Sequence, residues 1–243
     1  MKANSYIIPT GCLSLDSIIN GGFKPNLTYL IYGEAESGKT TLALQAAINA
    51  AKQGFKTIYV DADSRFSTER FSQIAGSEYE ALLPLILVLR PESFREQEYI
   101  IDHLHQYVSG GVRLVVFDTL TTLYRLEVGD REETFLLNRE LNRQVAFIAD
   151  VTKKSNLATL IISQVRQVMD HEGEDVNSVE PVATRVLKFW ADVIIALKRT
   201  QRSEVIQALV EKGAAYRDRA ECYLYIGSRG LSDLEKANRE VEG

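Results

Sequence analysis

Residues 33–40 read GEAESGKT and fit the pattern G-x-x-x-x-G-K-T. Glycines let such a loop curl so that its backbone amides point at a phosphate, and the start of a following helix adds a positive field. We expect Lys39 to contact the β- and γ-phosphates of ATP and Thr40 to place its hydroxyl on Mg²⁺. The residues expected to hold the nucleotide are Gly33, Glu34, Ala35, Glu36, Ser37, Gly38, Lys39, Thr40 and Thr41.

Two acidic residues, Glu34 and Glu36, lie inside this loop. Negative side chains near phosphates weaken binding unless they point to solvent. We therefore expect weaker nucleotide binding rather than its absence. The alternative is a glycine-rich turn that matches the pattern by chance, but an apolar run before the loop and a helical pattern after it favour the phosphate-binding interpretation.

A second carboxylate position follows the apolar run LVVFD, residues 114–118. A strand that ends in aspartate is the Walker B arrangement, in which Asp118 would hold a magnesium ligand at the edge of a sheet. Apolar strands ending in aspartate are common, so Asp118 is assigned to a magnesium site only because the phosphate-loop motif is also present. The pair predicts one Mg²⁺ site built from Thr40 and Asp118.

Further polar residues end two other predicted strands. Asp61 and Asp63 close TIYVDAD, residues 57–63, and one of them could orient an attacking water; the alternative for Asp61 is a cap on the next helix. Gln164 follows LATLIIS, residues 157–163, and could sense the γ-phosphate, although a solvated amide at a strand end explains it equally well. Because aspartate reaches less far than glutamate, Asp63 predicts slow hydrolysis.

The elements around these residues alternate along the chain. Apolar runs at 27–32, 57–63, 113–118 and 157–163 are separated by helical patterns at 39–52, 93–108 and 132–154. This alternation predicts a mostly parallel α/β sheet with helices on both faces. Residues 164–181 are polar and acidic and predict a loop, whereas runs at 190–199, 204–212 and 221–227 predict three strands that extend the sheet in antiparallel fashion.

Composition limits the function classes. The chain has 243 residues and a formal net charge of −5, so no bulk attraction draws it onto nucleic acid. Cys12 and Cys222 lack metal-ligand spacing, so neither a zinc site nor a disulfide is expected. The start has no apolar leader and no stretch is long enough for a membrane span, so we expect a cytoplasmic protein that does not bind membranes.

With these residues in place, the chain resembles the RecA/RadA recombinase superfamily and, within it, the archaeal RadB family, from about Ile8 to Asp233. TGCLSLDSIINGG resembles the entry to the RecA-type core, and DADSRFSTERF resembles the stretch D-T-E-G-x-F-x-x-E-R. The segment after Asp118, LTTLYRLEVGDREETFLLNRELNRQVAFI, is similar to RadB, and ISQV matches the N-Q-V sensor strand.

This resemblance implies a RecA-like P-loop ATPase core over residues 11–231, between a short segment 1–10 and a charged tail 232–243. It places Arg70 over the adenine and Asp63 on the catalytic glutamate, so weak magnesium-dependent ATPase is the most we expect. Because so few residues precede the core, we expect no helix-hairpin-helix domain, no F-x-x-A linker and no strand exchange. Only Lys212 remains of the family's basic K-H-R-type run.

The resemblance implies an accessory role in homologous recombination and DNA repair, assisting the RadA recombinase or a junction-processing nuclease. DNA binding would be weak and largely sequence-independent. Two alternatives stay open: a KaiC-like regulatory ATPase acting on protein partners, and a metabolic kinase, for which a lid and a second substrate segment are missing. The cations available for DNA are Arg125, Arg131, Arg166, Lys198, Arg199, Arg202, Arg217 and Arg219.

Overall fold

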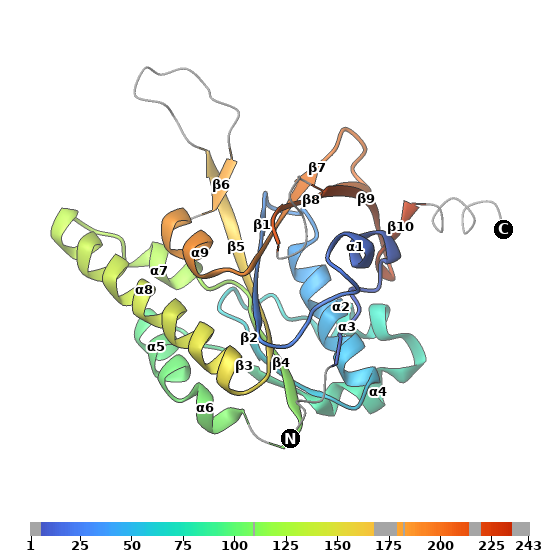
Figure 1. Ribbon diagram of the computed structural model, residues 1–243, viewed down its shortest axis with the longest axis horizontal. Helices are drawn as coiled ribbons and strands as arrows, with labels where there is room; N and C mark the ends of the chain where they lie inside the picture. The colour runs from blue at the N-terminus through green and yellow to red at the C-terminus, as the bar shows by residue number, and fades with distance from the viewer. Residues whose placement is uncertain (1–5, 109, 168–178, 182, 214–219, 235–243) are drawn as a thin grey trace.

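The computed structural model describes residues 6–108, 110–167, 179–181, 183–213 and 220–234. Within these ranges the chain forms one twisted sheet with helices on both sides (Figure 1). No helix in the described part of the chain is long and apolar enough to cross a membrane. The expected fold class, a mostly parallel sheet flanked by helices with an antiparallel C-terminal part, is confirmed.

The sheet has the order β10-β9-β8-β7-β1-β5-β4-β2-β3, with β6 paired to β5. Neighbours from β7 to β3 run parallel, whereas β7, β8, β9 and β10 are joined by antiparallel pairings. The strands are β1 (Leu27–Gly33), β2 (Lys56–Val60), β3 (Ile86–Leu89), β4 (Val112–Phe117), β5 (Ala158–Gln167), β6 (Val179–Pro181), β7 (Val193–Arg199), β8 (Val205–Lys212), β9 (Ala220–Gly227) and β10 (Gly230–Asp233).

Helices cover both faces because the central strands are apolar on both sides. In β1, Tyr29 and Ile31 face one buried cluster, whereas Leu30 and Tyr32 face the other. Figure 1 shows α1 to α4 on the first side and α5 to α9 on the second. The helices are α1 (Leu13–Ile18), α2 (Lys39–Lys52), α3 (Thr68–Ala75), α4 (Tyr79–Leu82), α5 (Phe94–Asp102), α6 (Leu104–Tyr107), α7 (Thr122–Leu126), α8 (Arg131–Lys154) and α9 (Thr184–Trp190), with 3-10 turns at Gly76–Glu78 and Leu83–Leu85.

The helical predictions hold with one change. Helix α8 begins at a capping box, in which Asp130 accepts from the Glu133 backbone and the Glu133 side chain accepts from that of Asp130. The helix expected over residues 93–108 is divided into α5 and α6 at His103. Two short strands, β3 and β10, were not expected, because runs of four residues give little periodic signal.

The loop expected to start at Gln164 starts later. Strand β5 continues to Gln167, and Val165, Arg166 and Gln167 pair with residues of β6 across a hairpin. The expectation was wrong for residues 164–167 and 179–181 because backbone pairing, rather than side-chain polarity, decides whether an edge segment becomes a strand. Of the five carboxylates in this segment, Glu180 lies in β6. The other four, Asp170, Glu172, Glu174 and Asp175, lie outside the described residues.

Buried polar contacts join the two ends of the chain to α2. The Gln45 side chain donates to the carbonyl oxygens of Thr10 and Leu231 and accepts from the Leu231 backbone amide. The Asp233 carboxylate accepts from the backbone amides of Leu13 and Ser14 at the start of α1. Strand β10 ends at Asp233, two residues beyond residue 231, where we expected the core to end and the charged tail to begin.

Candidate functional site

The phosphate loop connects the centre of the sheet to α2. Strand β1 lies between β5 and β7, so Gly33 leaves the sheet at its middle. A Cβ atom on Gly33 would lie 2.1 Å from the carbonyl oxygen of Leu197, so only glycine lets the loop pack against β7. Gly38 precedes the first residue of α2 with φ +85°, in the left-handed region. The two glycines of the motif therefore serve different steric needs.

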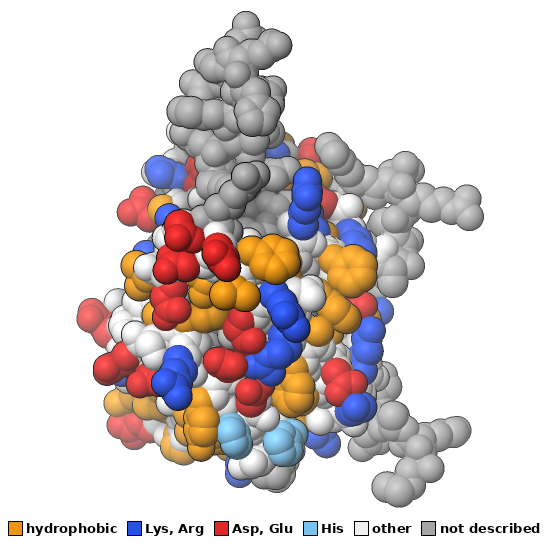
Figure 2. All heavy atoms as spheres, turned by 90° about the vertical axis from the view of Figure 1, so that its left-hand side faces the viewer, with side chains coloured by type: hydrophobic (Ala, Val, Ile, Leu, Met, Phe, Trp, Pro, Cys, Tyr) orange, Lys and Arg blue, Asp and Glu red, His pale blue; other side chains and the backbone are white. Residues whose placement is uncertain are grey.

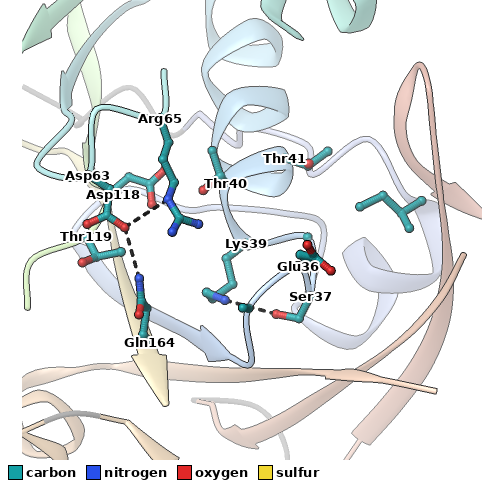
Figure 3. A pocket seen from close by; sticks show the side chains of 13 residues that line it. Glu36, Ser37, Lys39, Thr40, Thr41, Asp63, Arg65, Asp118, Thr119 and Gln164 are labelled. Atoms are coloured by element: carbon teal, nitrogen blue, oxygen red, sulfur yellow. Dashed lines mark hydrogen bonds and ion pairs between the residues drawn. The ribbon is translucent and has the colours of Figure 1, made fainter. Parts of the chain in front are cut away.

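The loop borders a pocket of about 340 Å³ at the carboxyl ends of the parallel strands (Figure 3). This is where ligands bind in open α/β sheets. The residues lining the pocket are Ala35, Glu36, Ser37, Gly38, Lys39, Thr40, Thr41, Asp63, Arg65, Asp118, Thr119, Gln164 and Ile226. The fold thus brings the predicted residues Lys39, Thr40, Asp63, Asp118 and Gln164 to one place.

Lys39 is buried at the base of this pocket. Its ammonium group donates to the carbonyl oxygens of Gly33, at 2.9 Å, and Glu34, and lies 3.3 Å from the Ser37 hydroxyl. Burial lowers the pKa of the lysine to about 8, although the Asp118 carboxylate works in the opposite direction. A cation held only by neutral acceptors gains from an incoming anion, so this position suits a phosphate.

Asp118 follows β4 on the opposite wall and is fully buried. The Tyr59 hydroxyl donates to its Oδ2 atom at 2.6 Å, whereas Oδ1 has no hydrogen-bond partner in the described protein. Burial raises the pKa of the carboxyl group, and the contacts with the Tyr59 and Thr40 hydroxyls partly offset this. A buried carboxylate oxygen without a partner is costly unless a cation or water binds it, so Oδ1 fits a magnesium ligand.

Asp63 and Gln164 meet at one side of the pocket. The Gln164 amide donates to Asp63 Oδ2 at 3.2 Å, and the Gln164 side-chain oxygen accepts from Arg125 at 3.1 Å. A second hollow of about 480 Å³ lies beyond this contact, and Thr122, Arg125 and Leu126 of α7 line it together with Asp63 and Gln164. The Gln164 side chain therefore contacts two charged partners, Asp63 and Arg125. The alternative interpretation, a strand-end amide that contacts only solvent, does not account for these contacts.

The alternative for Asp61 was a cap on the next helix, and the structure gives it a related role. Its buried carboxylate accepts from the backbone amides of Arg65 and Phe66, whereas Ser67 caps α3. Arg90 forms an ion pair with the same carboxylate at 3.2 Å. Asp61 thus holds the turn that carries Asp63 and does not line the pocket.

Sequence reasoning missed three residues that line the pocket. Thr119 follows Asp118 directly, and the peptide bond between them is cis. Arg65 lies in the turn after β2, two positions after Asp63, and nothing in the sequence distinguishes it from a solvated arginine. Ile226 comes from β9 and carried no local signal, because only the antiparallel extension brings it to the loop.

The two acidic residues of the loop differ in their relation to the pocket, because Glu36 lines it and Glu34 does not. Glu34 and Glu36 are exposed, and the Glu36 side chain lies 3.8 Å from the Arg199 guanidinium. Both side chains are thus exposed to solvent, the condition under which such charges spare a bound phosphate, but Glu36 also lies at the pocket. Exposure to water and the Arg199 cation screen the negative charge of Glu36.

Arg70 does not line the pocket. Its guanidinium donates to the carbonyl oxygens of Gly227 and Ser228, between β9 and β10, and to the Gln73 side chain. It thereby joins α3 to the turn that follows Ile226. The contact of Arg70 with the adenine stays a prediction. It requires the adenine to lie outside the phosphate pocket, beside the turn that Arg70 contacts.

The cations expected for DNA are dispersed. Lys198 and Arg199 end β7 and Arg202 lies in the turn before β8, and all three are exposed. Arg125 donates to the Gln164 side chain, and Lys212, which is not one of these eight cations, donates to the carbonyl oxygen of Ala191. The remaining four are Arg131, which begins α8, Arg166, which lies in β5, and Arg217 and Arg219, which fall outside the described residues.

Comparisons with known proteins agree on one family. The family profile described as Rad51 matches residues 2–234. The chain is 33% identical over 232 residues to the DNA repair and recombination protein RadB of Thermococcus kodakarensis, covering 94% of this chain and 100% of that protein. It is 32% identical over 200 residues to the RadB of Methanosphaera stadtmanae, covering 82% and 83%. The crystal structure of the RadB recombinase superposes with a TM-score of 0.79 at 30% identity, covering 94% of this chain and 100% of that one.

Proposed function

Since this chain belongs to the Rad51 family, we propose that it binds ATP with Mg²⁺ in the pocket between the phosphate loop and Asp118. One observation carries the proposal: the buried Oδ1 atom of Asp118 lacks a hydrogen-bond partner in the described protein, in a pocket that Lys39 and Thr40 also line. Unsatisfied buried carboxylate oxygens are rare, and Asp118 lines the same pocket as the motif that binds phosphates.

In this proposal each residue of the pocket has a separate role in holding the nucleotide and the metal. Lys39 neutralises phosphate charge at the base of the pocket, and backbone amides of residues 34–40 surround the phosphates. Thr40 and Asp118 would hold Mg²⁺, which would neutralise the charge of the phosphate oxygens. Arg70 lies beside the pocket, where we place the adenine.

We assign Asp63 to positioning a water for slow hydrolysis. Its carboxylate is engaged twice, by the Gln164 amide at 3.2 Å and by the Arg65 guanidinium at 3.3 Å. Both partners contact its Oδ2 atom, so this oxygen is less available to a water. Together with the short reach of aspartate, these contacts favour a weak ATPase.

We propose a role in DNA repair and recombination, as the name of the curated relatives states for those proteins. In this role the ATP-bound chain assists the RadA recombinase or a junction-processing nuclease, and it does not exchange strands by itself. The KaiC-like alternative, in which only proteins are bound, shares the phosphate pocket but requires no DNA contact. Binding to DNA therefore separates the two.

DNA contact would use the exposed end of β7 and the turn before β8, where Lys198, Arg199 and Arg202 stand close in sequence. The face formed by α5, α7, α8 and α9 is less suited, because basic, acidic and hydrophobic side chains are mixed on it (Figure 2). A mixed surface gives little net attraction to a phosphate backbone. We therefore expect weak binding that depends on salt and little on sequence.

Asp118→Asn tests the nucleotide proposal, because asparagine keeps the shape but loses the charge that would hold the metal. For wild-type protein we expect tighter ATP binding with Mg²⁺ than with a chelator, measured by isothermal titration calorimetry. In Asp118→Asn this magnesium dependence should disappear, whereas in the control Glu34→Gln, which alters an exposed carboxylate of the loop, it should remain. A full magnesium dependence in Asp118→Asn would refute the assignment.

A further inference from the structure

Arg65 is the second cation of the phosphate pocket, and the predicted nucleotide site did not include it. Among the lining residues only Lys39 and Arg65 are basic, whereas Glu36, Asp63 and Asp118 are acidic. Without Arg65 a single buried lysine would face three carboxylates. A pocket with that balance would repel a triphosphate, so the charge of Arg65 matters for any anion that enters.

The backbone of Arg65 is held firmly. Its amide donates to Asp61 Oδ1 at 2.8 Å, and the next amide, of Phe66, donates to Asp61 Oδ2 at 3.0 Å. Arg90 locks the same turn by pairing with Asp61 and by donating to the Phe66 carbonyl oxygen at 3.1 Å. The turn is therefore fixed on a buried carboxylate, and the starting point of the Arg65 side chain is fixed with it.

The side chain itself is free to change partners. It is 56% exposed, and its Nε atom lies 3.3 Å from Asp63 Oδ2, the same oxygen that accepts from Gln164. Figure 3 shows the forked end of the guanidinium pointing past this contact toward Lys39 and the phosphate loop. The Asp63 side chain is only 5% exposed, so the pair is half-buried, and a partner that carries more negative charge must compete with this carboxylate for the guanidinium.

We propose that Arg65 contacts the third phosphate of a nucleoside triphosphate from within the same chain and thereby makes the pocket select triphosphates over diphosphates. The inference rests on the proposed nucleotide binding. A guanidinium binds phosphate through two parallel hydrogen bonds, and a terminal phosphate carries more negative charge than the Asp63 carboxylate. Moving Arg65 to the phosphate leaves Asp63 with Gln164 as its donor, so the third phosphate also changes the surroundings of Asp63.

The test compares a non-hydrolysable ATP analogue with ADP, both with Mg²⁺, by calorimetry. We expect Arg65→Ala to weaken the analogue about tenfold or more and ADP by less than about twofold, since one charge-assisted contact is lost only from the triphosphate. Arg65→Lys should recover part of the analogue affinity, because it restores the charge without the fork. Arg139→Ala, which removes an exposed arginine of α8, serves as the matched control and should change neither affinity.

An unchanged ratio of the two affinities in Arg65→Ala, through equal losses or through no loss, would overturn the inference while leaving nucleotide binding intact. If wild-type protein bound neither nucleotide, the proposed function would fail first and this inference with it. Circular dichroism checks folding, and Arg65→Gln, which keeps most of the side-chain stem, replaces Arg65→Ala if the alanine variant does not fold.

Discussion

The Gln164 amide donates to Asp63 Oδ2 at 3.2 Å and so joins the strand beside the phosphate loop to the turn after β2. Its oxygen accepts from Arg125 of α7 at 3.1 Å. A change in the position of Asp63 can therefore reach α7 through one side chain. The proposed role of Gln164 as a γ-phosphate sensor requires such a connection between the pocket and the segment after Asp118.

The first prediction concerns Asp63. Asp63→Glu should speed magnesium-dependent ATP hydrolysis, because the longer side chain brings its carboxylate closer to a water at the terminal phosphate. Asp63→Asn should slow it below the wild-type rate, since the amide accepts no proton. Phosphate release under saturating ATP measures both. A wild-type rate as high as that of a fully DNA-stimulated recombinase would contradict this assignment of Asp63.

The second prediction follows from the pKa of Lys39, which burial lowers from 10.5 to about 8. Below pH 8 the folded protein holds a charge that burial disfavours, so Lys39 reduces stability there. Lys39→Met should therefore raise the free energy of unfolding of the nucleotide-free protein at pH 7 by about 1–3 kcal/mol. The advantage of the variant should shrink between about pH 8 and pH 10.5, as the buried lysine loses its proton.

Urea denaturation of both proteins at pH 7 and pH 10 measures this difference. Comparing the two proteins removes the effect of other groups that titrate in this range, such as the Cys12 thiol, whose pKa burial raises to about 12. A less stable Lys39→Met protein at pH 7 would show that the lysine stabilises the empty loop instead.

The third prediction concerns DNA. Replacing Lys198, Arg199 and Arg202 together by alanine should weaken DNA binding about equally across sequences, because phosphate contacts carry no sequence information. Each lost contact should reduce the log-log salt slope by about 0.9 on duplex or about 0.7 on single strands. Fluorescence anisotropy of ATP-loaded protein on single-stranded, duplex and branched DNA measures this.

The control for the DNA prediction removes the same charge elsewhere. Arg95, Arg139 and Lys153 are exposed on α5 and α8, and their joint replacement by alanine should leave binding unchanged. If both triple variants lose affinity equally, the effect is one of net charge rather than of the β7 end. If wild-type protein binds no DNA even at low salt, the KaiC-like alternative gains.

The fourth prediction concerns the contact that joins both chain ends to α2. Gln45→Ala should lower the free energy of unfolding by about 2–4 kcal/mol, because it leaves buried groups of Thr10 and Leu231 without partners. Gln53→Ala is a matched control at the C-cap of the same helix, since Gln53 also donates to the N-terminal segment, at Ile7, but is exposed. A loss as small as that of the control would mean that water replaces the Gln45 contacts.

Local patterns predicted most of the site. The phosphate loop is contiguous in sequence, and Asp63, Asp118 and Gln164 each come at the end of an apolar run, so neighbouring parallel strands bring them together. Ile226 could not be found in this way, because its place depends on how three antiparallel strands fold back beside the loop. Arg65 escaped for another reason: an arginine in a turn is usually solvated surface, and only the geometry shows that it faces the pocket.

The elements of the fold separate in the same way, into those that local sequence patterns predict and those that depend on a distant partner. Long amphipathic or buried segments such as α2, α8 and β4 carry a strong periodic signal and were predicted. Strands β3 and β6 have four and three residues, and they form because a neighbour pairs with them rather than because their own residues demand it. The extension of β5 to Gln167 likewise depends on β6, a partner beyond the acidic segment.

Binding of a fluorescent ATP analogue to wild-type protein and to Lys39→Ala, with Mg²⁺ and with folding checked by circular dichroism, tests the central claim most directly. Lys39 is the buried cation at the base of the phosphate pocket, and its replacement removes the charge where the phosphates would converge. We expect saturable binding by wild-type protein and none by folded Lys39→Ala. Equal affinities of the two proteins would contradict nucleotide binding at this site.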